Sequence, residues 1–257
     1  MLGYPRRMLA FLSPAKSLDY ASVIPEFAVT TPRFETESTV LADAASGLSV
    51  QRLMDLMDIS ENLAVLNVER YANFLNLPER PAIRAFAGDV YVGFEAKSLD
   101  EPAITFAQDH VRILSGLYGL LRPLDLIRPY RMEMGTRWAP AGGDLYGFWG
   151  RRIADLVLSD LAAEGSNTIV NLASREYWGA VEGKLDAARV ITIDFREDGP
   201  NGLRFNSFGA KRARGMMARF ICENRLVDAE DLKGFDSDGY RYESDGSEAD
   251  FWRFIRR

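Results

Sequence analysis

The feature that most constrains the fold is a set of short apolar runs that end in a turn or a polar residue. Runs of this length fit buried strands, and the longer segments between them have the apolar spacing of helices. The runs lie at residues 8–12, 81–86, 111–114, 168–172 and 190–195, and an alternating stretch closes the chain at 251–257. We therefore predict a mixed α/β (α+β) fold with a central mixed sheet and surrounding helices.

The chain is long enough to bury one large core. Its 257 residues are 47 % apolar, and nothing in the sequence forces a split into two domains. Residues 1–7 contain Gly3 and Pro5 and have no periodicity that a core could use. We predict a single domain over residues 8–257, preceded by a dispensable N-terminal extension.

Several protein classes are disfavoured by what the sequence lacks. No 18-residue apolar run is present, so neither a membrane span nor a signal peptide is supported. Cys222 is the only cysteine, which excludes an internal disulfide and fits a reducing, cytoplasmic setting. With His110 as the only histidine, an ordinary zinc or haem site is disfavoured, and we predict no metal and no cofactor. For the oligomeric state, a monomer is favoured.

The composition of residues 111–137, with arginines, tyrosines and prolines close together, is the least typical of a generic soluble domain. Arg122 and Arg128 each precede a proline, which keeps both on extended or turn backbone. Guanidinium groups here lie close in sequence to Tyr118 and Tyr130, a combination suited to phosphate or carboxylate groups. The alternative is a set of structural ion pairs, with Arg122, Arg128, Arg131 and Arg137 as cations and Asp125, Glu133 and Asp144 as their partners.

The charge of the chain is unevenly distributed. The net charge of −6 disfavours a polyanionic partner at first sight. Residues 111–152 carry seven arginines against three acids, however, and residues 205–225 carry five basic residues against one acid, so each has a net charge of +4. Residues 226–250 carry two basic residues against nine acids, a net of −7. Two basic segments can still form one basic cleft, and it is the local field that steers a polyanion.

Polar residues follow several predicted strands, at the edge where open α/β sheets usually bind ligands. Lys16 comes just after the first strand, although a solvated turn lysine is the plainer interpretation. Asp89 stands at a strand-to-helix junction, where it serves equally well as an N-cap. The full polar set is Lys16, Asp89, Tyr130, Glu133, Asn171, Ser174 and Glu176.

A helix predicted at residues 209–220 carries Lys211, Arg212 and Arg214 in its first turns. The helix dipole is unfavourable to cations at that end. Their presence therefore indicates a nearby anion, either an acidic side chain or a bound phosphate.

A tight helical hairpin is predicted where Ser49 caps one helix and Ser60 begins the next. Residues 53–64 resemble the helix-hairpin-helix of DNA-binding proteins, in which backbone amides hold a phosphate. That motif prefers glycines where this chain has Asp58 and Ser60, and an aspartate beside a phosphate is unfavourable. An ordinary helical hairpin is the alternative.

Five segments together resemble the YaaA family of bacterial peroxide-stress proteins: residues 12–19, 87–93, 113–136, 171–177 and 210–215. The resemblance runs from Met8 to the C-terminus. It implies a cytoplasmic single-domain α/β protein that gives resistance to hydrogen peroxide by limiting unincorporated iron and so sparing DNA. It also implies DNA binding, through a helix-hairpin-helix and a basic cleft in an unusual fold. It carries over no catalytic residue.

Two functions follow from these patterns. The first is DNA binding of low sequence specificity in a basic cleft, with phosphate contacts from Lys16, Ser60, Arg128, Arg131, Lys211, Arg212 and Arg214. The second is an enzyme acting on a nucleotide-like or phosphorylated small molecule at the polar strand-end set. No nucleophile elbow, P-loop or dinucleotide fingerprint is present, so whether the protein is an enzyme stays open. Direct iron storage is disfavoured, because the chain has no helical Glu-x-x-His pair.

Overall fold

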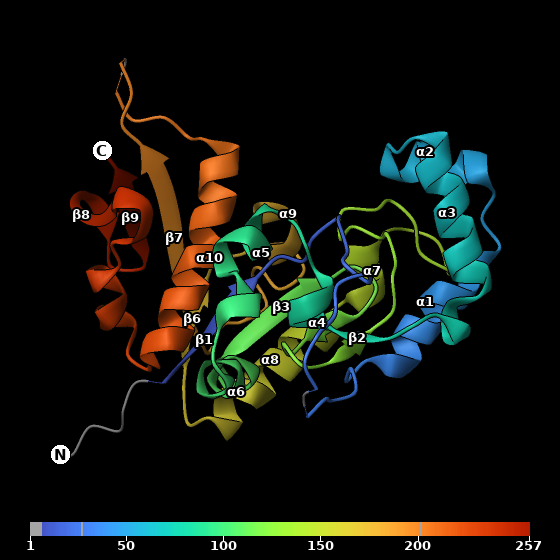
Figure 1. Ribbon diagram of the computed structural model, residues 1–257, viewed down its shortest axis with the longest axis horizontal. Coiled ribbons are helices and arrows are strands. Elements are labelled where there is room, and N and C mark those ends of the chain that lie inside the picture. The colour runs from blue at the N-terminus through green and yellow to red at the C-terminus, as the bar shows by residue number, and fades with distance from the viewer. Residues whose placement is uncertain (1–6, 27, 201) are drawn as a thin grey trace.

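A seven-stranded mixed sheet forms the centre of the computed structural model, which describes residues 7–26, 28–200 and 202–257 (Figure 1). The strands lie in the order β4-β3-β1-β6-β7-β9-β8. Their bounds are β1 (Met8–Leu12), β3 (Val111–Ser115), β4 (Gly119–Leu121), β6 (Thr168–Asn171), β7 (Arg189–Glu197), β8 (Tyr240–Glu248) and β9 (Phe251–Arg256). The predicted α/β class is confirmed, and every predicted strand except residues 81–86 belongs to this sheet.

Five neighbouring strands are parallel, and β4 and β8 are antiparallel to their neighbours. Taken in chain order, the parallel strands run 2-1-3-4-5 across the sheet. This is the order of flavodoxin-like doubly wound sheets, whose ligands bind where the winding changes direction. Here that switch point lies between the C-terminal ends of β1 and β6.

Helices cover both faces of the sheet. On one face, Phe11 of β1 meets Trp178 of α9 (Arg175–Trp178) edge to face, with ring centroids 5.9 Å apart. On the other face, α6 (Glu101–His110) and α10 (Ser207–Asn224) pack over β1. The central strands are therefore buried on both sides, which explains why they are nearly continuous apolar runs in the sequence.

The helix α5 (Asp89–Phe94) crosses α10 at two glycines. A Cβ on Gly215 would lie 1.8 Å from the carbonyl oxygen of Val90, and one on Gly93 would lie 2.1 Å from that of Arg212. Backbone thus meets backbone, and only glycine fits at either position. The crossing fixes where the first turns of α10 stand relative to the sheet.

The predicted helical hairpin lies at the right of Figure 1, to one side of the sheet. It consists of α2 (Val50–Met57) and α3 (Glu61–Ala72), which pack together beside α1 (Glu35–Ser46). Ser49 caps α2 as predicted, because its side chain accepts a hydrogen bond from the Arg52 amide. Asp58 takes a left-handed conformation with φ of 49°. Glycine takes that conformation more readily than aspartate.

The prediction of a strand at residues 81–86 was wrong. Only Arg80 and Pro81 form a strand, β2 (Arg80–Pro81), which pairs with β5 (Leu126–Ile127). The next residues turn into the short helix α4 (Ala82–Ala85), whose first amides donate to the carbonyls of Asp125 and Pro123. Hydrogen bonds from the distant 123–125 loop therefore override the local apolar pattern.

The segment between β3 and β6 forms two helices, α7 (Leu145–Trp149) and α8 (Arg152–Ala163), separated at Gly150, whose φ is 52°. Short 3₁₀ turns complete the chain; they are η1 (Phe74–Asn76), η2 (Ala96–Ser98), η3 (Ala229–Gly234) and η4 (Ser237–Gly239).

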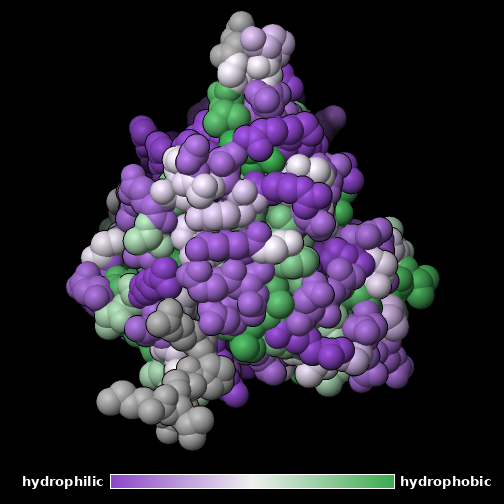
Figure 2. Space-filling view, turned by 90° about the vertical axis from the view of Figure 1, so that its left-hand side faces the viewer, coloured by the Kyte–Doolittle hydropathy of each residue, from purple (hydrophilic) through white to green (hydrophobic). Residues whose placement is uncertain are grey.

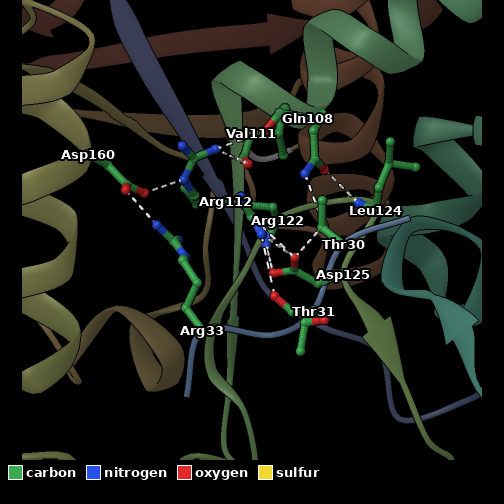
Figure 3. A network of polar contacts seen from close by, with 10 residues as sticks. All are labelled: Thr30, Thr31, Arg33, Gln108, Val111, Arg112, Arg122, Leu124, Asp125 and Asp160. Atoms are coloured by element: carbon green, nitrogen blue, oxygen red, sulfur yellow. Dashed lines mark hydrogen bonds and ion pairs between the residues drawn. The ribbon is translucent and has the colours of Figure 1, made fainter. Parts of the chain in front are cut away.

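A polar network, which we call the Asp160 network, ties the loop before α1 to β3 and α8 (Figure 3). Arg33 and Arg112 each place a guanidinium nitrogen 2.5 Å from a carboxylate oxygen of Asp160. Arg112 also donates to three backbone carbonyls, those of Gln108, Asp109 and Val111. The Arg112 guanidinium is therefore well paired at β3, whereas Nε and Nη2 of Arg33 are buried without a hydrogen-bond partner among the described residues.

The edge strand β8 was not predicted, because its sequence is mostly polar and acidic. Figure 2 shows that the side of the molecule carrying β8 and β9 is mainly hydrophilic, with small separate hydrophobic areas. Charged side chains on an edge strand oppose pairing with another chain.

Residues 1–6 of the predicted N-terminal extension lie outside the described residues. Arg7, the last residue of that extension, forms an ion pair with Glu164 at 3.3 Å. That the extension is dispensable stays a prediction.

Candidate functional site

The loops that follow β1 and β6 meet at the switch point of the sheet. Ser13, directly after β1, accepts a hydrogen bond of 2.8 Å from the Ser174 amide, and the two hydroxyls lie 3.3 Å apart. The Tyr91 hydroxyl donates to the Ser13 carbonyl. The strand ends that carry the predicted polar residues are therefore held together by direct bonds.

Three predicted residues gather beside this junction, and we call them the strand-end cluster: Lys16, Arg131 and Glu133. One oxygen of Glu133 lies 3.2 Å from the Lys16 ammonium and 2.5 Å from Nε of Arg131. Its other oxygen is buried and has no hydrogen-bond partner among the described residues. Two cations expected to meet phosphate thus share a carboxylate of the protein itself.

Tyrosines form the floor of the strand-end cluster. The Tyr130 hydroxyl is 2.7 Å from that of Ser115, at the end of β3, and Tyr71 donates to the Arg131 carbonyl. Burial raises the pKa of Tyr130 and of Tyr71 well above the usual range, so both are neutral hydrogen-bonding groups. The space enclosed here is about 10 Å³, enough for one water molecule at most.

A much larger cavity, which we call the strand-end cavity, lies on the other side of Ser174. β7 continues to Glu197, beyond its last pairing with β6 at Asn171 and Thr192, and the cavity occupies the space past the end of β6. Its volume is about 740 Å³. The structure brings four predicted residues together in its lining: Asn171, Ser174, Lys211 and Arg214.

The basic residues of α10 are divided between two cavities. Lys211 and Arg214 are three residues apart and face the strand-end cavity. Arg212 instead faces a second cavity of about 390 Å³, together with Asp89 and the exposed ring of Phe208. Lys211 and Arg212 are exposed, and their side chains have no ion-pair partner in the part of the chain that the structure describes.

Two other predicted phosphate contacts lie elsewhere. Arg128 pairs with Glu79 at 2.9 Å, with its guanidinium over the ring of Phe74. Ser60 is exposed at the start of α3, and its side chain makes no capping hydrogen bond. The structure therefore does not gather the seven predicted contacts in one cleft.

The alternative interpretation of the arginines in residues 111–137 is confirmed for two of them. Arg122 pairs with Asp125 at 3.0 Å, and Arg131 pairs with Glu133. Asp144 has a different role, since it caps α7 by accepting a hydrogen bond from the Gly147 amide.

Glu176 and Asn171 make local hydrogen bonds that order the loops around the site. One oxygen of Glu176 accepts from the Gly135 amide at 3.0 Å. Asn171 accepts from the Ala173 amide at 2.9 Å, which shapes the turn after β6. Both side chains position backbone at the strand ends.

The sequence analysis missed the residues of β7 that line the strand-end cavity. Asp194 and Arg196 face it, and Arg253 of β9 reaches Asp194 at 3.1 Å. A signal was present, because Thr192, Asp194 and Arg196 alternate with Ile193 and Phe195 in the pattern of a strand with one polar face.

Among the described residues, no group of three or more His, Cys, Asp or Glu side chains is placed to hold a metal ion. Within the same ranges, no helix is long and apolar enough to cross a membrane.

The fold and the site define a class: a doubly wound α/β protein with a polar pocket at the switch point and strand ends of its sheet. Comparison with known families gives a narrower assignment. Residues 8–246 match the family described as "Peroxide stress protein YaaA", and the chain belongs to that family. A general role in peroxide stress follows from this membership.

Curated relatives cover almost the whole chain. A UPF0246 protein of Rhizorhabdus wittichii is 63 % identical over 97 % of this chain and 99 % of its own length. A UPF0246 protein of Polynucleobacter asymbioticus is 50 % identical over 91 % of this chain and 93 % of its own. One from Cupriavidus metallidurans is 48 % identical over 97 % and 99 % of the two chains. The predicted resemblance to the YaaA family is confirmed.

Proposed function

We propose that the protein protects DNA during peroxide stress by binding it with low sequence specificity at the N-terminal half of α10. The observation that carries this proposal is the pair Lys211 and Arg212, two exposed cations without an acidic partner among the described residues. Phosphate groups would satisfy both. The helix dipole adds little to this attraction, because α10 begins at Ser207 and both cations lie beyond its first turn.

The remaining predicted contacts support a smaller interface than a full basic cleft. Lys16 and Arg131 share Glu133, and Arg128 pairs with Glu79, so each would have to leave a carboxylate to reach DNA. Phe208, 73 % exposed, lies one helical turn before Lys211 and Arg212 and adds an aromatic surface beside them.

The helical hairpin is a second, separate contact in this proposal. The amides at the start of α3 are not capped by the Ser60 side chain, which leaves them available to a phosphate. Asp58 and Glu61 are acidic neighbours that oppose such a contact. Figure 1 shows the hairpin at the right and α10 over the left half of the sheet, so one duplex would have to extend across both.

We also propose that the protein limits unincorporated iron, acting as a monomer in the cytoplasm. The absence of a metal-holding cluster among the described residues favours an indirect effect over storage. Binding to DNA or to a small molecule would then connect the protein to iron levels.

The test of DNA binding is the double change Lys211→Ala with Arg212→Ala. Duplex affinity should fall for all sequences alike, and the slope of log affinity against log salt should flatten by about two, since two phosphate contacts are lost. Gel shifts over a salt series measure both quantities. The matched control is Arg151→Ala with Arg152→Ala, which removes the same charge from exposed positions at the start of α8. Unchanged affinity and slope in the α10 variant would remove these residues from the interface.

The second candidate function is an enzyme that acts on a nucleotide-like or phosphorylated small molecule. The strand-end cavity favours it, because about 740 Å³ at the C-terminal edge of the sheet is within the range of small-ligand sites. Non-specific DNA binding has no need of such a cavity.

A further inference from the structure

The strand-end cavity has more positive charge in its lining than the protein neutralises. Its basic residues are Arg175, Arg196, Lys211 and Arg214, and its acids are Glu182 and Asp194. Glu182, Arg175 and Lys211 are exposed, so the charges enclosed in the cavity are Asp194, Arg196 and Arg214. The charge balance of the cavity therefore depends on what Asp194 already binds.

Asp194 is bound by two arginines. Nε of Arg196 lies 2.9 Å from both of its oxygens, and Nε of Arg253 lies 3.1 Å from one of them. These bonds leave Arg214 without a carboxylate of its own among the described residues.

Among the described residues, Arg214 is a cation of this cavity that has no carboxylate partner. Its Nε is buried and has no hydrogen-bond partner in the part of the chain that the structure describes. Burial lowers the pKa of Arg214, and the nearby charge of Asp194 only partly opposes that shift. A desolvated guanidinium with a free donor is costly to keep unless an anion meets it. Lys211 faces the same cavity and adds a second unmatched charge.

Aromatic side chains also line the cavity. Phe205 is 54 % exposed, and the Arg196 guanidinium lies 5.4 Å from its ring centroid. Trp178, Phe251 and the hydroxyl residues Thr192 and Ser207 complete this part of the lining. The lining thus offers cations, hydroxyl groups and aromatic rings.

We propose that the strand-end cavity binds a nucleoside monophosphate, with the phosphate at Arg214 and Lys211 and the base against Phe205. A phosphate dianion matches the two unpaired cations, and guanidinium is suited to phosphate geometry. A base fits the aromatic rings, because stacking needs only a flat π surface. The proposal rests on the small-molecule function put forward above and names its ligand class.

The experiment is isothermal titration of the full-length protein with AMP, GMP, adenosine and inorganic phosphate. The nucleotides should bind, adenosine should bind at least tenfold more weakly, and Phe205→Ala should weaken AMP at least threefold while leaving inorganic phosphate unchanged. Arg214→Gln should weaken AMP at least tenfold. Lys211→Gln changes an exposed residue and keeps the test valid if Arg214→Gln fails to fold; it should also weaken AMP. Arg151→Gln is the matched control and should bind as wild type does.

Three outcomes would overturn the proposal: no binding of either nucleotide, equal affinity for AMP and inorganic phosphate, or normal AMP binding by both cavity variants. Duplex binding is measured in parallel with Arg212→Gln, because Arg212 faces the other cavity. That variant should lose DNA affinity and keep AMP affinity. Failure of DNA binding alone leaves the nucleotide site standing, and failure of AMP binding alone leaves the DNA proposal standing.

Discussion

Around Asp160, Arg33 and Arg112 share one carboxylate, and Arg112 also donates to three backbone carbonyls. Around Asp194, two arginines bind the carboxylate, and Arg214 has no carboxylate partner among the described residues and lies beside a cavity. Both regions place guanidinium groups in the interior. Buried guanidinium nitrogens without a hydrogen-bond partner among the described residues occur in both, namely Nε and Nη2 of Arg33 and Nε of Arg214. The regions differ in that Arg214 has no carboxylate partner among the described residues and lines a cavity of about 740 Å³.

The pKa shifts express the same difference. Burial lowers the pKa of Arg112 and of Arg214 alike. For Arg112, both the charge of Asp160 and a hydrogen bond to it oppose the shift, whereas Arg214 has only the charge of Asp194. A buried charge that the fold leaves uncompensated lowers stability, and such a group beside a cavity is a candidate for a functional site. The Asp160 network is therefore structural, and the strand-end cavity is the candidate for function.

The largest effect is expected for Asp160→Ala. The buried Arg112 and the partly buried Arg33 lose the one carboxylate that each pairs with among the described residues, so the free energy of unfolding should fall by about 3–5 kcal/mol. Urea unfolding followed by circular dichroism measures this change. The matched control is Asp155→Ala on the same helix, whose exposed ion pair with Arg151 should cost less than about 1 kcal/mol. Similar losses in the two variants would mean that burial does not distinguish the Asp160 network.

Much of this architecture could be predicted from the sequence, because it depends on local patterns. The runs at 8–12 and 111–114 became β1 and β3, and Ser49 capped its helix. The pairing of Arg131 with Glu133 was open to prediction because both lie in one short stretch. Apolar periodicity and charges that are close in sequence can be recognised in the chain itself, and they determine these features.

The strand-end cavity could not be predicted in the same way. It requires Asp194 and Arg253 to be paired across β7 and β9, which are joined by a long segment containing α10 and β8. It also requires the glycine crossing that sets α10 in place. Both depend on the sheet order and on contacts between distant segments, and the sequence pattern of one strand carries neither.

A matched pair of substitutions gives an intermediate effect and tests the comparison directly. Arg112→Met should destabilise the protein by roughly 2 kcal/mol or more, because the partly buried Asp160 loses a partner and three carbonyls lose a donor. Arg214→Met should stay within about 1 kcal/mol of wild type or be slightly more stable, since it removes an unmatched charge and keeps an unbranched chain of similar length. Urea unfolding without added phosphate measures both. Equal losses would show that Arg214 is a structural residue like Arg112.

The smallest change in the free energy of unfolding is expected from a change of pH. This change tests the contribution of the ionised Asp160 carboxylate. Burial alone would raise the pKa of Asp160, but hydrogen bonds and charge from Arg33 and Arg112 outweigh it, so the pKa is lowered. A lowered pKa in the folded state contributes stability above the unfolded value of about 4, and that contribution is lost as pH falls through the folded pKa. The advantage of wild type over Asp160→Asn should therefore be constant from pH 7 to 5. Below about pH 4 it should shrink, by no more than about 1.4 kcal/mol per pH unit. A constant difference down to pH 3 would mean that the ionised form of Asp160 does not hold the network together.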